Sequence, residues 1–174
     1  PYDVTISAAT TTASNPSAGL WSSAGSTTSY VNATDIATRL NQGTNVTVST
    51  GNSGASTDGN ITVASPITGT GAGGAAKLTL TANHNIAVSN TISVAGSGSM
   101  VELNAGNASG GGAVSLGAAV NVDTLSVNVT GAGTITQSAA VTTNNLKLTG
   151  TSTDVTLNNS SNKVGTCLLY TSDA

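Results

Sequence analysis

The sequence contains no phenylalanine, and aromatic residues make up only 2% of its 174 residues. Aromatic rings supply much of the buried area in ordinary protein cores, so a core built without them has to be narrow and filled by short aliphatic side chains. No apolar run approaches the roughly 20 residues that a membrane-spanning helix needs. The sequence therefore indicates neither a bulky globular core nor a transmembrane helix.

Charged residues, cysteine and histidine are also scarce. Only 6% of residues are charged, four are basic and the net charge is −3, so the basic patch of a nucleic-acid-binding protein is lacking. A single Cys167 excludes an internal disulfide, and a single His84 leaves no zinc-ligand spacing. This usage suits an exported protein that does not depend on disulfides. The chain opens at Pro1 without an initiator methionine or a signal segment, so we expect a processed or excerpted sequence.

Threonine, serine, asparagine, glycine, valine and isoleucine dominate what remains. Such mixtures can be disordered, but disordered chains usually carry more charge and fewer β-branched residues. β-Branched residues favour strands, and glycine, asparagine and serine favour turns. The composition predicts many short strands joined by tight turns.

An eight-residue pattern occurs four times, at intervals of 21 to 28 residues. Each copy has an apolar-x-apolar pair, a bend of small residues and another aliphatic residue. The copies read NITVASPI (60–67), NIAVSNTI (85–92), AVSLGAAV (113–120) and TITQSAAV (134–141). A two-sheet sandwich also has many short strands, but it does not require this repeat. A solenoid of three-strand coils does, because each coil buries its apolar face only against its neighbours. Each copy is therefore predicted to be one corner of a coil.

The other apolar-x-apolar pairs complete about five coils. Their predicted starts are Val46, Leu78, Val101, Leu125 and Leu146, which lie 32, 23, 24 and 21 residues apart. The first interval is longer because residues 51–59 and 68–76 look like inserted loops. Asn60 and Asn85 hold the same place in the pattern, which fits either a ladder of stacked amides or a residue type suited to bends.

One segment departs from the strand pattern and predicts a helix of about two turns, at about 33–41, beside the first full coil. Asn32 is a candidate N-cap, and Asp35 follows three residues later, as in a capping box. Ile36 and Leu40 share one face, and Gly43 can end the helix.

The chain divides into three parts on this interpretation. Residues 1–29 are predicted to hold a leading strand at 4–6 followed by a Ser/Thr/Gly-rich loop over 10–28. Residues 30–166 form the coils and the helix. The tail CLLYTSDA (167–174) drops the alternation and is predicted to be irregular. It resembles translated sequencing-adapter read-through, and the alternative is a cap over the open end of the solenoid.

Four stretches carry a family resemblance. They are DIATRLNQGTNVTVSTGNSGASTDGNITVASPI (35–67), AKLTLTANHNIAVSNTISV (76–94), GTITQSAAVTTNNLKLTG (133–150) and VTLNNSSNKVGT (155–166). In this order they resemble the repeat region of filamentous-haemagglutinin-like bacterial surface proteins, over about residues 29–166.

The resemblance implies a right-handed parallel β-helix. It also implies two-partner secretion from a Gram-negative bacterium through an outer-membrane transporter, and adhesion to surfaces, host cells or neighbouring bacteria. The receptor or glycan is not specified by the resemblance. The secretion-signalling domain of this family carries an Asn-Pro-Asn motif. Here the only Asn-Pro is Asn15-Pro16, which Ser17 follows, so we expect that domain to be absent and the chain to be a section of stalk.

The sequence predicts no catalytic, cofactor-binding or metal-ligating residue. Sugar-cleaving β-helix enzymes, the main enzymatic alternative, need paired carboxylates and often calcium. The acidic residues here are Asp3, Asp35, Asp58, Glu102, Asp123, Asp154 and Asp173. Aligned by coil, no two share a position in adjacent coils, so they are predicted to be solvated charges and turn formers. Glu102 and Lys147 are predicted to share an outward position two coils apart.

The remaining candidate motifs also favour structural roles. His84 is predicted to be an exposed bend residue. The glycine-rich stretches 69–76 and 109–113 lack the Lys-Ser/Thr of a phosphate loop, and the calcium-binding nonapeptide is missing. An ice-binding threonine array is not maintained. Its candidates Thr47, Thr62 and Thr79 are followed in later coils by Glu102, Ser115, Ser126 and Lys147.

These observations favour a non-enzymatic stalk segment of a secreted adhesin, with no cofactor and no nucleic-acid partner. Two alternatives remain. The chain could be a subunit of a self-assembling extracellular fibre, since two open coil ends would invite end-to-end association. It could also be a carbohydrate-active β-helix protein.

Overall fold

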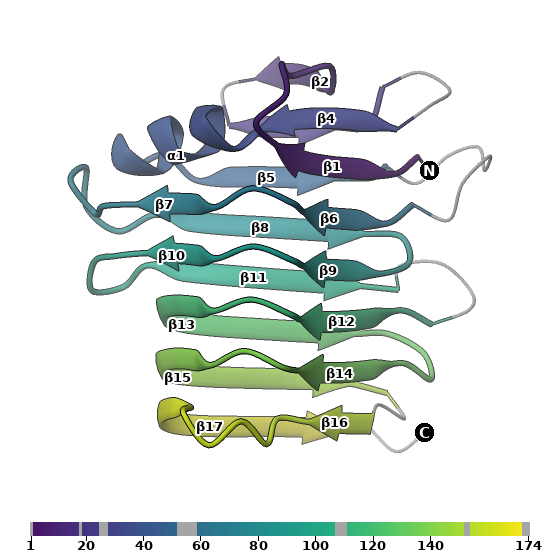
Figure 1. Cartoon of the computed structure of the whole chain (residues 1–174), viewed down its shortest axis with the longest axis vertical. Helices are drawn as coiled ribbons and strands as arrows, with labels where there is room; N and C mark the ends of the chain where they lie inside the picture. Colours follow the sequence, from purple (N-terminus) through teal and green to yellow (C-terminus); the bar gives the residue numbers. More distant parts are fainter. Residues whose placement is uncertain are drawn as a thin grey trace.

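The computed structural model describes residues 2–17, 19–24, 28–51, 59–106, 111–151 and 154–171. The chain winds into a parallel β-helix that is 53% strand, with one short helix (Figure 1). In Figure 1 the nearer strands run to the left and the more distant strands run to the right as the chain descends, which is right-handed winding. The predicted fold class is confirmed, although the stack has about six turns rather than five.

Each full turn has three faces. The first is a seven-stranded sheet in the order β16 (Asp154–Thr156), β14 (Thr134–Gln137), β12 (Ala113–Leu116), β9 (Ile86–Val88), β6 (Ile61–Val63), β1 (Val4–Ser7) and β4 (Ser29–Asn32). The long face holds β17 (Lys163–Thr171), β15 (Val141–Gly150), β13 (Val120–Val129), β11 (Met100–Ala105), β8 (Lys77–Ala82), β5 (Val46–Ser49), β3 (Leu20–Ser22) and β2 (Ser14–Ser17). The short face holds β7 (Ile67–Gly69), β10 (Ile92–Val94) and the first residues of β13, β15 and β17. Among the pairs described, only β2–β3 is antiparallel.

The eight-residue pattern marks the corner between the seven-stranded sheet and the short face. Its first aliphatic positions stack as one row, Ile61, Ile86, Val114 and Ile135. Its last positions stack as another, Ile67, Ile92, Val120 and Val141. The predicted coil starts form a third row, Val46, Leu78, Val101, Leu125 and Leu146, which continues to Cys167. The periodicity of the sequence therefore predicts these rows correctly.

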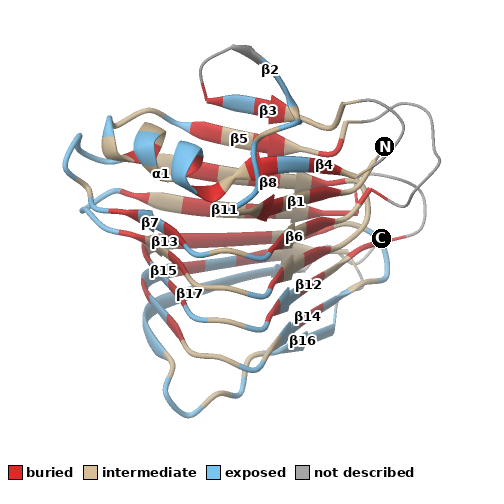
Figure 2. Cartoon of the chain, turned by 45° about the horizontal axis from the view of Figure 1, so that its top comes forward, coloured by how far each residue is buried: buried red, intermediate tan, exposed pale blue. Residues whose placement is uncertain are grey.

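Aliphatic rows fill the interior. Along β8 and β11 every second side chain is buried, and Leu80 and Leu103 are fully covered. Figure 2 shows the buried positions recurring from turn to turn along the strands of the stack. Strand neighbours lie about 4.8 Å apart, so each aliphatic side chain packs directly on its counterparts. Because burying one such side chain contributes about 1.5–3 kcal/mol, the rows can stabilise the fold without an aromatic cluster.

A polar ladder runs beside these rows at the start of the seven-stranded sheet. Asp3 Oδ1 accepts the backbone N–H of Asn60 at 2.8 Å. Asn60 Oδ1 accepts the backbone N–H of Asn85 at 3.1 Å, and Asn85 Oδ1 accepts that of Ala113 at 2.8 Å. Of the two interpretations of Asn60 and Asn85, the ladder is therefore the observed one. Each amide satisfies the backbone of the next turn.

Helix α1 (Ala33–Asn41) contacts β7 near the N-terminal end of the stack, and its bounds match the prediction. Asn32 is the N-cap and accepts the N–H of Thr34 at 2.8 Å. The expected capping box is indirect. Thr11 Oγ1 accepts the Asn32 N–H at 2.9 Å and donates to Asp35 Oδ2 at 2.8 Å, so a third residue relays the contact.

Gly43 ends this helix in the left-handed conformation, with φ of 71°. Its N–H donates to the carbonyl of Leu40 at 3.0 Å, and the N–H of Thr44 donates to that of Arg39 at 3.0 Å, which is a Schellman motif. A Cβ at this position would lie 2.4 Å from the carbonyl oxygen of Gly73. Both conformation and space therefore require glycine.

The stretch 10–28, which the sequence indicates as a loop, contains β2 and β3. Trp21 of β3 lies above Val48 in an inward row and is 2% exposed. Strand β2 covers the outer edge of β3. The N–H groups of Thr12 and Ala13 both donate to the carbonyl of Tyr30, at 2.9 and 3.0 Å, and cover the outer edge of β4. These segments and α1 form the N-terminal cap.

The leading strand predicted at 4–6 is present as β1, but its neighbours were not predicted. Val4 faces Ser29 of β4 on one side and Ile61 of β6 on the other. In the order of winding, β4 and β6 would be adjacent. The first strand of the chain therefore lies between two strands that come much later.

The tail also differs from the expectation of irregular structure. Strand β17 continues to Thr171, and Cys167 and Leu169 stack on Leu146 and Leu148. Residues 172–174 lie outside the described residues, as do residues 52–58 of the first predicted loop. In the second predicted loop, residues 68 and 69 belong to β7.

Candidate functional site

The acidic residues that the structure describes are dispersed over the molecule. Asp3 begins the polar ladder, Asp35 lies on α1, Glu102 faces outward on β11, Asp123 stands at a bend within β13 and Asp154 opens β16. Asp58 and Asp173 lie outside the described residues. Within the described part of the chain, no three histidine, cysteine or acidic residues gather as a group that could hold a metal ion.

Glu102 and Lys147 lie in one outward row, with Ser126 between them, as the sequence predicts. Glu102 is more than a solvated charge, because its carboxylate forms an ion pair with Lys77 of the preceding turn. The two side chains of this pair are 25% and 40% exposed. Exposed pairs of this kind contribute about 0–1 kcal/mol, so the pair is a minor structural contact.

His84 and Cys167 are not brought together. His84 lies at the bend before β9, where its Nδ1 is 2.9 Å from Nδ2 of Asn85. Cys167 is exposed on β17, three turns further along the stack. A thiol activated by a histidine would need the two side chains within hydrogen-bond reach. The structure therefore offers no such activation for Cys167.

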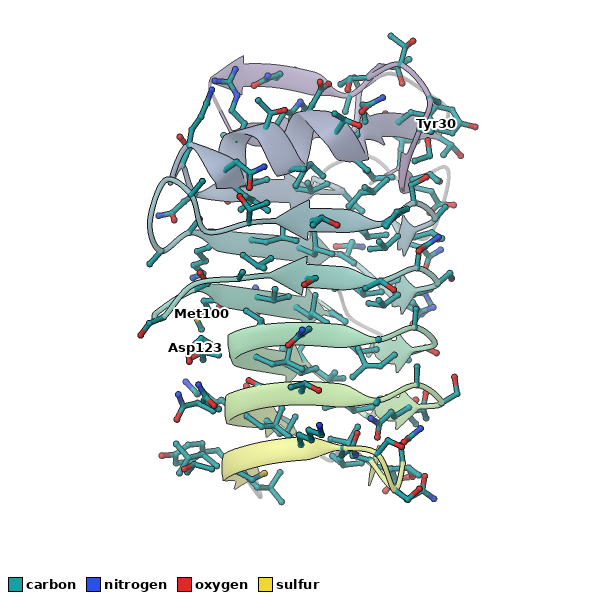
Figure 3. The ribbon with its side chains drawn as sticks, turned by 60° about the vertical axis from the view of Figure 1, so that its left-hand side comes forward. Tyr30, Met100 and Asp123 are labelled. Atoms are coloured by element: carbon teal, nitrogen blue, oxygen red, sulfur yellow. The ribbon has the colours of Figure 1, made fainter. Side chains whose placement is uncertain are left out.

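A polar groove of about 730 Å³ follows the short face across several turns. Its lining includes Ser93, Asn121, Thr142 and Lys163, which stack in one outward row. Asp123 also lines it and projects outward near Met100 of the neighbouring turn (Figure 3). The groove offers hydroxyl and amide groups with one carboxylate and one ammonium group.

Asp123 joins the turns on either side of it. One oxygen, Oδ2, accepts the backbone N–H of Gly98 at 2.8 Å, and Oδ1 accepts Nδ2 of Asn144 at 2.6 Å. These two bonds, the backbone bond first, hold the pKa of Asp123 below its ordinary 3.8. A general acid for sugar cleavage needs a raised pKa and a second carboxylate. Asp123 is instead a cross-turn connector, which the sequence predicted only as a turn former.

The outward threonines form no continuous array along the stack. Thr47 and Thr79 share one outward row, and Glu102 follows them. Thr62 belongs to a different row on the seven-stranded sheet, where Ala87 comes next. The interruption predicted from the sequence is therefore present in both rows.

The C-terminal end of the stack is uncovered. Five of the seven exposed large apolar side chains that the structure describes lie there: Val155 (37% exposed), Val164 (36%), Leu168 (49%), Leu169 (59%) and Tyr170 (56%). Within the described residues, β16 and β17 are the last strands of their sheets and have a neighbour on one side only. This end therefore presents both apolar side chains and open strand edges.

Comparison of the chain with protein-family models, with characterised proteins and with solved structures finds no match in any of the three. None of the helical residues that the structure describes forms a helix long and apolar enough to cross a bilayer. The function has to be inferred from the fold and from the surfaces above.

Proposed function

We propose that this chain is a non-catalytic stalk segment of a secreted bacterial adhesin, which holds a binding part of the parent protein away from the cell surface. The observation that carries this proposal is the unbroken stacking of aliphatic rows through successive turns. Each turn contacts only its neighbours, so turns can be added without changing the cross-section. That is the property a spacer needs.

The dimensions and the surface agree with such a role. About six turns at about 4.8 Å each give a rod of roughly 29 Å. The polar groove on the short face has one carboxylate, and its two oxygens already bind Gly98 and Asn144. Export through an outer-membrane transporter, and adhesion itself, follow from the family resemblance of the sequence.

A second candidate is a self-assembling fibre subunit, which the exposed apolar side chains of the C-terminal turn favour. The sequence suggested two open ends, whereas the structure has one. At the other end, β2 covers β3, and Thr12 and Ala13 cover β4. Head-to-tail stacking would have to displace this cap, so the stalk is the better-supported proposal.

Sequencing the source gene outward from both sides tests the stalk. We expect apolar-x-apolar coils to continue, a domain with an Asn-Pro-Asn motif to lie upstream, and a transporter gene to be adjacent. A reading frame that ends directly after Ala174, with no transporter gene nearby, would overturn the proposal.

Assays on the purified chain separate the two alternatives. Electron micrographs over a range of concentrations would show lengthening filaments if the chain is a fibre subunit. Cleavage of polysaccharides in the presence of calcium, abolished by Asp123→Asn, would instead identify a carbohydrate-active enzyme. The stalk proposal expects neither result.

A further inference from the structure

A hollow of about 440 Å³ lies in the N-terminal cap, away from the groove on the short face. One side is a stripe of α1 and the residue after it, with Asp35, Arg39 and Gln42 at helical spacing. Thr11 lies on the other side, and Trp21 of β3 lines the hollow from the interior. The volume falls within the range of about 300–1,000 Å³ that is typical of small-molecule sites.

The hollow brings together two residue types that occur once in the chain. Trp21 is the single tryptophan, and Arg39 is the single arginine. Trp21 is 2% exposed, and Arg39 is half-buried. The other turns of the stack are built from aliphatic rows and outward Ser, Thr and Asn. The hollow therefore differs in chemistry from the rest of the molecule.

Three groups on its walls have no partner among the described residues. They are the guanidinium of Arg39, the side-chain amide of Gln42 and the indole N–H of Trp21. No fully buried side-chain nitrogen or oxygen is left without a hydrogen bond. The indole nitrogen of Trp21 therefore reaches the surface, and the surface that Trp21 lines is the hollow.

Asp35 supplies the complementary acceptor. It precedes Arg39 by four residues, a spacing that commonly gives an ion pair on a helix. The ion pair is not formed here, and Asp35 Oδ2 instead accepts from Thr11 Oγ1 at 2.8 Å. The guanidinium is thereby left available while the carboxylate is held in place.

We propose that this hollow binds a carboxylated sugar unit, such as a hexuronate residue of a polysaccharide. The guanidinium of Arg39 would take the sugar carboxylate through paired N–H donors. Trp21 and Gln42 donate to oxygen atoms of the sugar, and Asp35 accepts from its hydroxyl groups. An inorganic anion has no hydroxyl groups for Asp35, and a neutral hexose has no charge for Arg39. A sugar acid satisfies both.

This site gives the segment a ligand of its own, whereas a stalk is only a spacer. It does not rest on the adhesin proposal, since it depends only on side chains of the cap. Its failure would leave the stalk proposal untouched.

The single tryptophan makes the test direct. The emission of Trp21 in the whole chain is followed during titration with glucuronic acid, galacturonic acid and glucose, with calorimetry in parallel. We expect a saturable change with the two acids and at least about tenfold weaker binding of glucose, a difference of about 1.4 kcal/mol. Arg39→Gln should abolish the preference for the acids.

Lys147→Gln is the matched control, because it removes the same charge from an outward position far along the stack. It should bind as the original chain does. Thermal melting of each variant checks that the cap is folded, and Gln42→Ala serves as a second variant if Arg39→Gln is unstable. The proposal is overturned if no sugar gives a saturable change, if glucose binds as well as the acids, or if the cap variants keep the preference.

Discussion

One inward row of side chains meets two different environments at its ends. It runs through Trp21, Val48, Leu80, Leu103, Val127, Leu148 and Leu169. Trp21 at the capped end is 2% exposed, whereas Leu169 at the other end is 59% exposed. In a stack of turns, an inward direction buries a side chain only if something covers the turn from outside.

The two ends also treat their strand edges differently. At the N-terminal end, β2 pairs with β3, and the N–H groups of Thr12 and Ala13 donate to Tyr30 of β4. At the C-terminal end, β16 and β17 have no further strand beside them among the described residues. Exposed edges are templates for pairing with other chains. Protection of an edge is therefore a property of the capping segments and not of the repeat.

The largest expected effect comes from truncating the two ends of the shared row. Trp21→Ala should lower the free energy of unfolding by about 3–5 kcal/mol, because it leaves a cavity in the cap. Leu169→Ala should change it by less than about 1 kcal/mol, because most of this side chain is already in water. Urea unfolding measures both. Equal losses would mean that the C-terminal turn is covered in solution.

A second prediction sharpens the role of the cap. Gly43→Ala should cost about 2 kcal/mol or more, because the residue has positive φ and its Cβ would collide with the carbonyl of Gly73. Gly74 also has positive φ, but nothing lies within 4 Å of its Cβ position. Gly74→Ala should therefore show only the conformational cost, about 1–2 kcal/mol. Identical unfolding curves for the two variants would contradict the close approach.

The relay through Thr11 should contribute a smaller amount. Thr11→Val keeps the shape but removes the hydroxyl group that links Asn32 to Asp35, so we expect a loss of about 1 kcal/mol. Thr156→Val, at the outward face of β16, is the control and should change stability by less than about 0.5 kcal/mol. Hydrogen exchange of the Asn32 amide should accelerate in the first variant. An unchanged exchange rate would argue against the relay.

The smallest expected effect lies between the ends, at Asp123. Its pKa in the folded protein is lowered from 3.8, so its ionised form stabilises the fold above that pH. This contribution is lost as the pH falls through the lower folded pKa. Melting temperatures should therefore fall less for Asp123→Asn than for the original chain between about pH 5 and about pH 2. Parallel curves would show that the bonds to Gly98 and Asn144 do not favour ionisation.

The central turns can be predicted from the sequence because several signals coincide. Leu78–Leu80 and Val101–Leu103 alternate with polar residues, and glycine or asparagine follows each pair at the bends. Helix α1 is equally legible, since Asn32 and Gly43 give independent signals for its two ends. Local signals are sufficient where each turn contacts only its neighbours.

The two ends are less legible for different reasons. Strand β3 has three residues, and its neighbours are set by tertiary packing of Trp21. In the tail, Cys167 and Leu169 fit the inward row, but Leu168 and Tyr170 are also large and hide the alternation. The hollow was missed because Thr11, Trp21 and Arg39 come from separate segments. The one available signal was that tryptophan and arginine each occur once.

The position of β1 between β4 and β6 affects the order of folding. Every later turn can be added by a local step as soon as its 21 to 28 residues are available. Strand β1 must instead wait for partners 25 and 57 residues away, at Ser29 and Ile61. Closing such loops costs entropy before the contacts form, and this slows folding. The first strand to be synthesised is therefore among the last to find its place, and the nucleus from which the rod grows lies in its middle.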